Sequence, residues 1–120
     1  MARDPTTPRA QRFTLYANAG RVLARNVDGK LIDLGRLGPD GGGAWHWQLD
    51  GNQLSGGGER SAEAALREIG RRMGFLYLDG QFTAVADLRE GGVPDLSRAE
   101  QVEITLDELQ PGERIEDARV

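Results

Sequence analysis

The residues whose types and spacing suit chemistry are two glutamates and three arginines in one stretch that reads WQLDGNQLSGGGERSAEAALREIGRRMGF. Glu59 and Glu68 carry carboxylates, the ligands that hard cations such as Mg²⁺ prefer. A bound Mg²⁺ would polarise a phosphate group and activate the attacking water. Arg67, Arg71 and Arg72 suit the opposite role, because guanidinium groups bind phosphate or carboxylate directly. The same stretch therefore offers two chemistries, metal-assisted hydrolysis and direct anion binding.

A helix must position these side chains, and the sequence predicts one over residues 61–73. Ser61 is a suitable N-cap, and Glu63 lies in the first turn, where the helix dipole favours negative charge. Gly74 is suited to end the helix. An apolar stripe at helical spacing gives the segment one buried face: Ala62, Ala65, Leu66, Ile69 and Met73.

Residues 47–75 resemble the Nudix box, the signature of hydrolases that act on nucleoside diphosphates linked to another group. That box reads G-x5-E-x7-R-E-U-x-E-E-x-G-U, where U is a bulky apolar residue, and W-x-L-P-G-G usually precedes it. Phe75 fits the final bulky position, and the lead-in has Asp50 in place of its proline. The residues that match in one register are Glu59, Arg67, Glu68, Ile69 and Gly74. The resemblance implies a Nudix-like α+β fold.

The departures from the box concern its metal ligands. The family has three carboxylates at i, i+3 and i+4, which share one helix face and converge on divalent cations. Here Glu68 remains, but Arg71 and Arg72 occupy the other two positions. Guanidinium groups repel a cation, so we predict that Nudix catalysis is impaired and that no cofactor is needed. In an active enzyme, Glu68 would be the catalytic residue, and Glu59 and Glu68 would hold Mg²⁺.

The helix arginines allow two interpretations. In the first, the face is solvated and its charges pair locally, Glu63 with Arg67 and Glu68 with Arg72, because residues four apart are neighbours on a helix. In the second, the arginines replace the metal and bind a phosphorylated ligand or an acidic protein surface. The candidate ligand-binding residues are then Arg67, Arg71, Arg72, Gly57, Gly58 and Trp47.

The glycines and tryptophans before the helix also have two interpretations. The glycines at 56–58 could cradle a phosphate, but no G-K-[ST] follows them, and a sharp loop explains them equally well. Trp45 and Trp47 share one face of a predicted strand at 44–49. They are therefore expected to be core anchors rather than a stacking platform. His46 points to the other face and is expected to be an ordinary strand residue.

The rest of the chain predicts short β-strands joined by turns. Strands begin at Phe13, and Asp28-Gly29 marks a hairpin whose second strand reaches residue 37. A loop is expected at 38–43 and a glycine-rich turn up to Gly58. A second hairpin is expected over 75–88, and a closing strand over 102–109 that runs into a turn or short helix.

These elements predict one α+β domain in which a mixed or antiparallel sheet packs with one main helix. Residues 12–110 would form this domain. Residues 1–11 are polar, contain two prolines and are expected to form a flexible arm. Residues 111–120 read as an acidic polar tail.

Composition narrows the function classes. The 120 residues carry a formal charge of −4, and residues 76–120 hold 4 basic and 11 acidic side chains. Nucleic acid binding needs a basic footprint, so this balance disfavours it. The chain has no cysteine, which excludes disulfides and thiolate metal sites. The first dozen residues contain no apolar run, so we expect no signal peptide, a cytoplasmic location and no membrane contact.

Three functional hypotheses remain. The first is a catalytically impaired Nudix-like domain that binds a partner protein or phosphorylated ligand. The second is a divergent Mg²⁺-dependent hydrolase that uses Glu59 and Glu68. The third is a small accessory or inhibitory protein of a mobile element that binds nucleic acid or a nucleic-acid-handling protein. A strand–strand–strand–helix order with a W-x-W strand also resembles small DNA-binding domains of the phage-integrase-arm type, but those read DNA with a basic sheet face. The sequence leaves the oligomeric state open.

Overall fold

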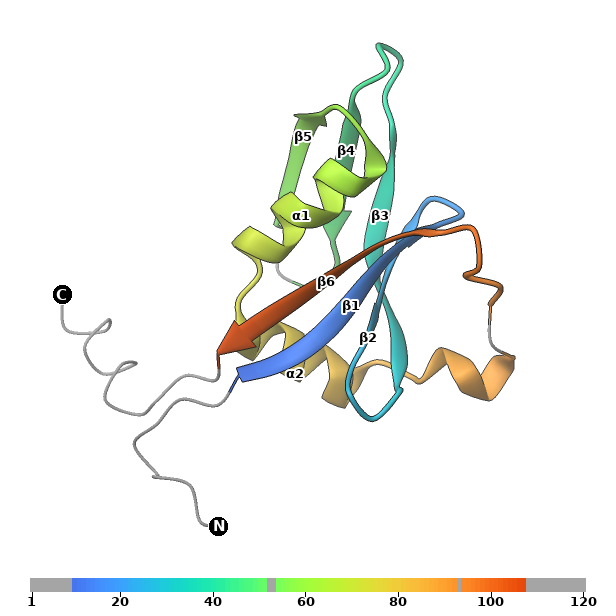
Figure 1. The fold of residues 1–120 in the computed structure, drawn as a ribbon, viewed down its shortest axis with the longest axis vertical. Helices are drawn as coiled ribbons and strands as arrows, with labels where there is room; N and C mark the ends of the chain where they lie inside the picture. The colour runs from blue at the N-terminus through green and yellow to red at the C-terminus, as the bar shows by residue number, and fades with distance from the viewer. Residues whose placement is uncertain (1–9, 52–53, 93, 108–120) are drawn as a thin grey trace, which may run out of the picture.

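A computed structural model describes residues 10–51, 54–92 and 94–107. Within them, six strands form a single antiparallel sheet in the order β5-β4-β3-β2-β1-β6, and the sheet curls into a half-barrel accompanied by two α-helices (Figure 1). The elements are β1 (Ala10–Asn18), β2 (Arg21–Arg25), β3 (Leu31–Pro39), β4 (Trp45–Leu49), β5 (Ser55–Glu59), α1 (Ala62–Arg72), α2 (Phe75–Ala84), a 3-10 helix η1 (Leu88–Gly91) and β6 (Glu100–Asp107).

The turns between the first strands follow from local chemistry. Ala19 and Gly20 both have positive φ, 52° and 79°, as a two-residue turn between right-twisted strands requires. The predicted Asp28-Gly29 hairpin is confirmed. It is held by the Asn26 side chain, which accepts hydrogen bonds from the backbone N–H groups of Asp28 and Lys30 at 3.1 and 2.9 Å.

The inner, concave face of the half-barrel holds the main core. Helix α1 lies across this face and buries the predicted apolar stripe. Ser61 caps the helix as expected, since its Oγ accepts a hydrogen bond from the Ala64 N–H at 3.0 Å. Gly70 lets the helix approach β6 closely, because a Cβ at this position would lie 2.8 Å from Cγ2 of Ile104. The edge strand β6 and helix α1 are therefore in direct contact.

A β-bulge in β3 decides which side chains face the core. The register shifts between β2 and β3, so that Val22 pairs with Gly35 and Leu23 with Asp33. A Cβ on Gly35 would lie 2.2 Å from the Gln48 carbonyl oxygen, so only glycine fits. As a result Leu34 and Leu37 are both buried while Arg36 is exposed. Strict alternation would have placed Arg36 on the same face as Leu34.

The outer, convex face carries a smaller apolar cluster formed by Tyr16, Leu23 and Leu31. Leu88 of η1 and Leu96 of the following loop pack against it. The remainder of the outer face is polar. The sheet is therefore covered fully on one side and only in part on the other.

The predicted hairpin over 75–88 is wrong, because residues 75–84 form helix α2. Leu78 and Phe82, four residues apart, are both buried, and Phe75 packs against the same core. This is a helical spacing, and burial of these side chains outweighs the turn preference of Asp79-Gly80. The fold therefore has two α-helices in its described ranges, not one main helix.

Two further expectations need correction. The glycine-rich turn up to Gly58 is instead the edge strand β5, which pairs with β4. β1 begins at Ala10, so the chain enters the sheet inside the segment predicted as an arm. The closing strand is confirmed as β6. The turn or short helix expected at its end, the first nine residues and the tail at 111–120 lie outside the described residues.

Candidate functional site

The three arginines of α1 have three different environments. Arg67 forms the predicted pair with Glu63, with its Nη2 2.8 Å from Oε2. The expected Glu68–Arg72 pair is wrong, because Glu68 pairs instead with Arg71, three residues further along the helix. Arg72 instead donates from Nη1 to the Ser55 carbonyl oxygen at 2.9 Å. Arg72 thus connects α1 to β5. The side chains of Arg67 and Arg71 are 60% and 71% exposed and pair with glutamates of their own helix.

Trp47 belongs to the core, as its alternation in β4 predicted. Its side chain is 1% exposed, and the Arg72 guanidinium lies 5.3 Å from its ring centroid. Strand β5 covers the indole closely at Gly56, where a Cβ would lie 2.7 Å from the ring. The next two glycines also lie on β5: Gly57 beside His46 of β4, and Gly58 with φ of 80°. Trp47, Arg72 and β5 therefore form one packed unit.

The predicted metal ligands lie on two consecutive elements, β5 and α1. Glu59 is the last residue of β5, and Glu68 is on α1 in contact with Arg71. Across 10–51, 54–92 and 94–107, no group of three His, Asp or Glu side chains is placed to hold a metal ion. Another carboxylate, Asp87, accepts hydrogen bonds from Arg89 and from the Leu31 N–H, and the Arg89 bonds hold its pKa well below the ordinary value.

A groove of about 300 Å³ runs along the surface where α1 and β6 meet, beside the contact of Gly70 with Ile104. One wall is helical, with Arg67 and Arg71 on either side of Gly70. The other wall is the strand segment 102–105. β6 pairs with β1 along its length and is the last strand in the sheet order, so its outer edge has no strand partner among the described residues. Arg67 and Arg71 therefore flank an open strand edge in the described part of the chain.

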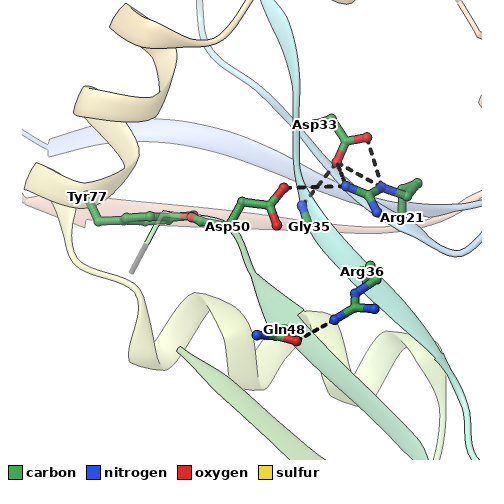
Figure 2. A network of polar contacts seen from close by, with 7 residues as sticks. All are labelled: Arg21, Asp33, Gly35, Arg36, Gln48, Asp50 and Tyr77. Atoms are coloured by element: carbon green, nitrogen blue, oxygen red, sulfur yellow. Dashed lines mark hydrogen bonds and ion pairs between the residues drawn. The ribbon is translucent and has the colours of Figure 1, made fainter. Parts of the chain in front are cut away.

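A polar network occupies the outer face over β2, β3 and β4 (Figure 2). Arg21 donates twice to Asp33, from Nε to Oδ2 and from Nη2 to Oδ1, each at 3.0 Å, and Nη2 lies 3.4 Å from Oδ2 of Asp50. The bond to Asp33 raises the pKa of Arg21 above its ordinary value. Asp33 Oδ1 also accepts from the Gly35 N–H at 3.0 Å. The network thus fastens the bulge to the neighbouring strand.

Tyr77 connects helix α2 to the end of β4. Its hydroxyl donates to the Asp50 carbonyl oxygen at 2.6 Å. Burial, with a smaller contribution from the Asp50 charge, raises the pKa of Tyr77 to about 12. The phenol therefore stays protonated and able to donate well above neutral pH.

Arg36 lies next to this network but outside it. Its Nη2 donates to Oε1 of Gln48, its cross-strand partner, at 2.6 Å. Together with His46 these two side chains line a pocket of about 330 Å³, whose remaining walls are Gly20, Leu37, Gly38 and Pro39. His46, expected to be an ordinary strand residue, thus lines the same pocket as Arg36 and Gln48.

The sequence did not single out Arg36 because its neighbours come from other strands. One signal was available: Gly35 follows Leu34 where the alternation of apolar residues breaks, which is the pattern of a bulge. Comparisons of the chain with protein-family models, curated proteins and solved structures found no match. Function must therefore be inferred from the sites themselves.

Proposed function

We propose that this protein is a non-catalytic binding domain that takes an extended acidic segment of a partner protein into the groove between α1 and β6. The observation that carries the proposal is the shape of the groove wall, where four consecutive residues of β6 at 102–105 line the groove. Consecutive side chains of a strand point to opposite faces. A groove in contact with all four therefore runs along the strand edge, where a second strand would add.

Main-chain groups would supply most of the affinity. An edge strand presents a row of N–H and C=O groups that can pair with another chain. Peptides that bind by strand addition take their affinity from these bonds and their specificity from alternate side chains. β6 has eight residues, Glu100–Asp107, held in place by its pairing with β1. The template is therefore already ordered before a partner arrives.

The charges around the groove specify which side chains the added strand carries. On its inner side the strand would face Arg67 and Arg71, which favours acidic residues at every second position. On its outer side it would lie beside Glu103, and like charges on neighbouring strands are destabilising. Exposed ion pairs such as Glu63–Arg67 contribute only about 0–1 kcal/mol. A partner carboxylate can therefore replace the helix glutamates at little cost.

A degenerate Nudix-like classification is part of this proposal. In its support, the predicted helix coincides with α1, Glu59 lies two residues before the N-cap Ser61, and Glu68 lies within the helix. Arg71 and Arg72 of this helix occupy the positions where the Nudix family places further metal ligands. The entirely antiparallel pairing of the described strands is a feature that the resemblance does not explain.

The proposal is tested with two synthetic ten-residue peptides of the same composition. In one, glutamate alternates with threonine, and in the other the glutamates are consecutive. We expect isothermal titration calorimetry to show tighter binding of the alternating peptide. The double variant Arg67→Gln/Arg71→Gln should weaken that binding about tenfold, since it removes two partly exposed ion pairs of up to about 1 kcal/mol each. Arg60→Gln, which removes an exposed arginine before the helix, is the matched control.

Three results would overturn the proposal. The first is equal affinity for the two peptides, and the second is equal affinity of the double variant and the wild type. The third is Mg²⁺-dependent hydrolysis of nucleotides or nucleotide sugars that is lost in Glu68→Gln, which would show the divergent hydrolase instead. Chemical-shift changes that the alternating peptide causes only at residues 67–71 and 102–105 would support the proposed binding groove.

A further inference from the structure

Arg36 lies beside the network of Arg21, Asp33 and Asp50 and has no carboxylate partner in the described part of the chain. Its neighbour Arg21 shares Asp33 and Asp50, whereas Arg36 contacts only the neutral amide of Gln48. A guanidinium carries five N–H donors in a fixed planar arrangement. One bond to Gln48 leaves most of these donors directed to solvent and available to an anion.

The register makes this arrangement unfavourable without a ligand. Arg21 and Arg36 are directly opposite each other on β2 and β3. Like charges in directly opposed positions destabilise a sheet, and only Arg21 has its charge balanced by carboxylates. Local features that disagree with the stability of the fold tend to mark functional sites. Because its direct partner Gln48 is neutral, the Arg36 guanidinium favours an anion as a further partner.

The pocket beside Arg36 supplies further donors. Oε1 of Gln48 accepts from Arg36, so the amide nitrogen of Gln48 remains free to donate. His46 and Gly38 are cross-strand partners, which places the imidazole diagonally from Arg36 on the same face. Gly38 adds no side chain to the cavity, and a Cβ there would meet no atom within 4 Å. The pocket's volume of about 330 Å³ is at the lower end of small-molecule sites, about 300–1,000 Å³.

We propose that this pocket binds the phosphate group of a small phosphorylated molecule, with Arg36 as the main ligand and Gln48 and His46 as additional donors. Phosphate accepts hydrogen bonds from several directions, which suits donors on two strands, and guanidinium groups bind phosphate in a bidentate manner. The site lies on the opposite face of the sheet from the α1–β6 groove. It is therefore independent of the proposed peptide binding.

The charge distribution of the same face favours a small ligand over nucleic acid. A nucleic-acid site needs a continuous basic track. Arg21 is neutralised by Asp33 on one side of the pocket, and β6 carries the exposed Glu103 on this face at the end of the sheet. Positive charge is concentrated at Arg36 and does not extend into a track.

The test uses the full chain with inorganic phosphate and pyrophosphate as probes. Binding is followed by calorimetry and by amide chemical shifts. We expect shifts at residues 36–38 and 46–48 and an affinity at least about tenfold weaker in Arg36→Gln. Arg36→Lys, which keeps the charge but loses the bidentate geometry, should fall between Arg36→Gln and the wild type. The matched control is Arg25→Gln, an exposed arginine of the same face that lies over Tyr16.

Equal weakening by Arg25→Gln and Arg36→Gln would overturn the proposal, because it would indicate general attraction to charge. Shifts confined to residues 67–71 would also overturn it, by placing the phosphate at the helix arginines. A short DNA duplex that binds more tightly than pyrophosphate, with strong salt dependence, would replace it with nucleic-acid recognition. Peptide binding in the groove should be unchanged in Arg36→Gln, so the two proposals fail independently.

Discussion

The two faces of the sheet use the same strands for opposite purposes. The inner face carries side chains such as Leu34, Leu49 and Trp47 and is sealed by α1 and α2. The outer face carries Arg21, Arg36 and their partners, and only a small apolar cluster covers part of it. The inner face thus supplies stability through burial, and the outer face keeps polar groups in contact with solvent.

The difference depends on one backbone irregularity. The bulge at Leu34-Gly35 shifts the alternation of β3 by one residue, so that Leu37 enters the core and Arg36 leaves it. Without the bulge, strict alternation along β3 would bury the Arg36 guanidinium and expose Leu37. The candidate phosphate pocket and the core are therefore set by the same feature.

The largest expected effect comes from removing that bulge. Gly35→Ala would place a Cβ 2.2 Å from the Gln48 carbonyl oxygen and 2.9 Å from the Leu49 Cα. Backbone atoms cannot yield as a flexible side chain does, so we expect a loss of about 3 kcal/mol or more in the free energy of unfolding. Gly38→Ala, in open space on the same strand, is the control. Urea denaturation measures both, and a Gly35→Ala variant as stable as Gly38→Ala would contradict the account of the bulge.

The next largest effect is expected from a substitution in helix α2, which covers part of the inner face. Leu78→Ala removes a fully buried side chain of α2 and should cost about 2–5 kcal/mol. Leu76→Ala removes one that is 48% exposed and should change stability by about 0.5 kcal/mol or less. Residues two apart share a face in a strand but lie on opposite sides of a helix. Similar losses for the two variants would favour the hairpin that the sequence predicts over helix α2.

The smallest effect concerns Tyr77, whose hydroxyl connects helix α2 to the end of β4. Its pKa of about 12 in the folded protein exceeds the ordinary value of 10.0, chiefly because of burial and secondly because of Asp50. Its contribution to stability is therefore complete below pH 10 and is lost as the pH rises from 10 to 12. The absorbance of tyrosinate, as the difference between wild type and Tyr77→Phe, should titrate near pH 12. A midpoint near 10 would show that the phenol is exposed.

Sequence reasoning succeeded where the signal was local. The capped helix at α1, the Asp28-Gly29 hairpin and the alternation around Trp47 each depend on neighbours within a few residues, and each is confirmed. It failed at α2 because the turn signal of Asp79-Gly80 competes with apolar residues whose burial only the packed core decides. It also paired Glu68 with Arg72, although Trp47 and Ser55 provide a better site for that arginine.

By itself, the sequence determined an α+β domain with a capped helix that carries Arg67, Glu68 and Arg71 outside its apolar stripe. That much follows from residue types and helical spacing, which act over short distances along the chain. Only the tertiary structure decided that β6 leaves an open edge beside those arginines and that Arg36 meets Gln48 and His46 on the outer face. Strand order and register join residues far apart in the chain, and they are fixed by burial of the whole sheet, not by any local pattern.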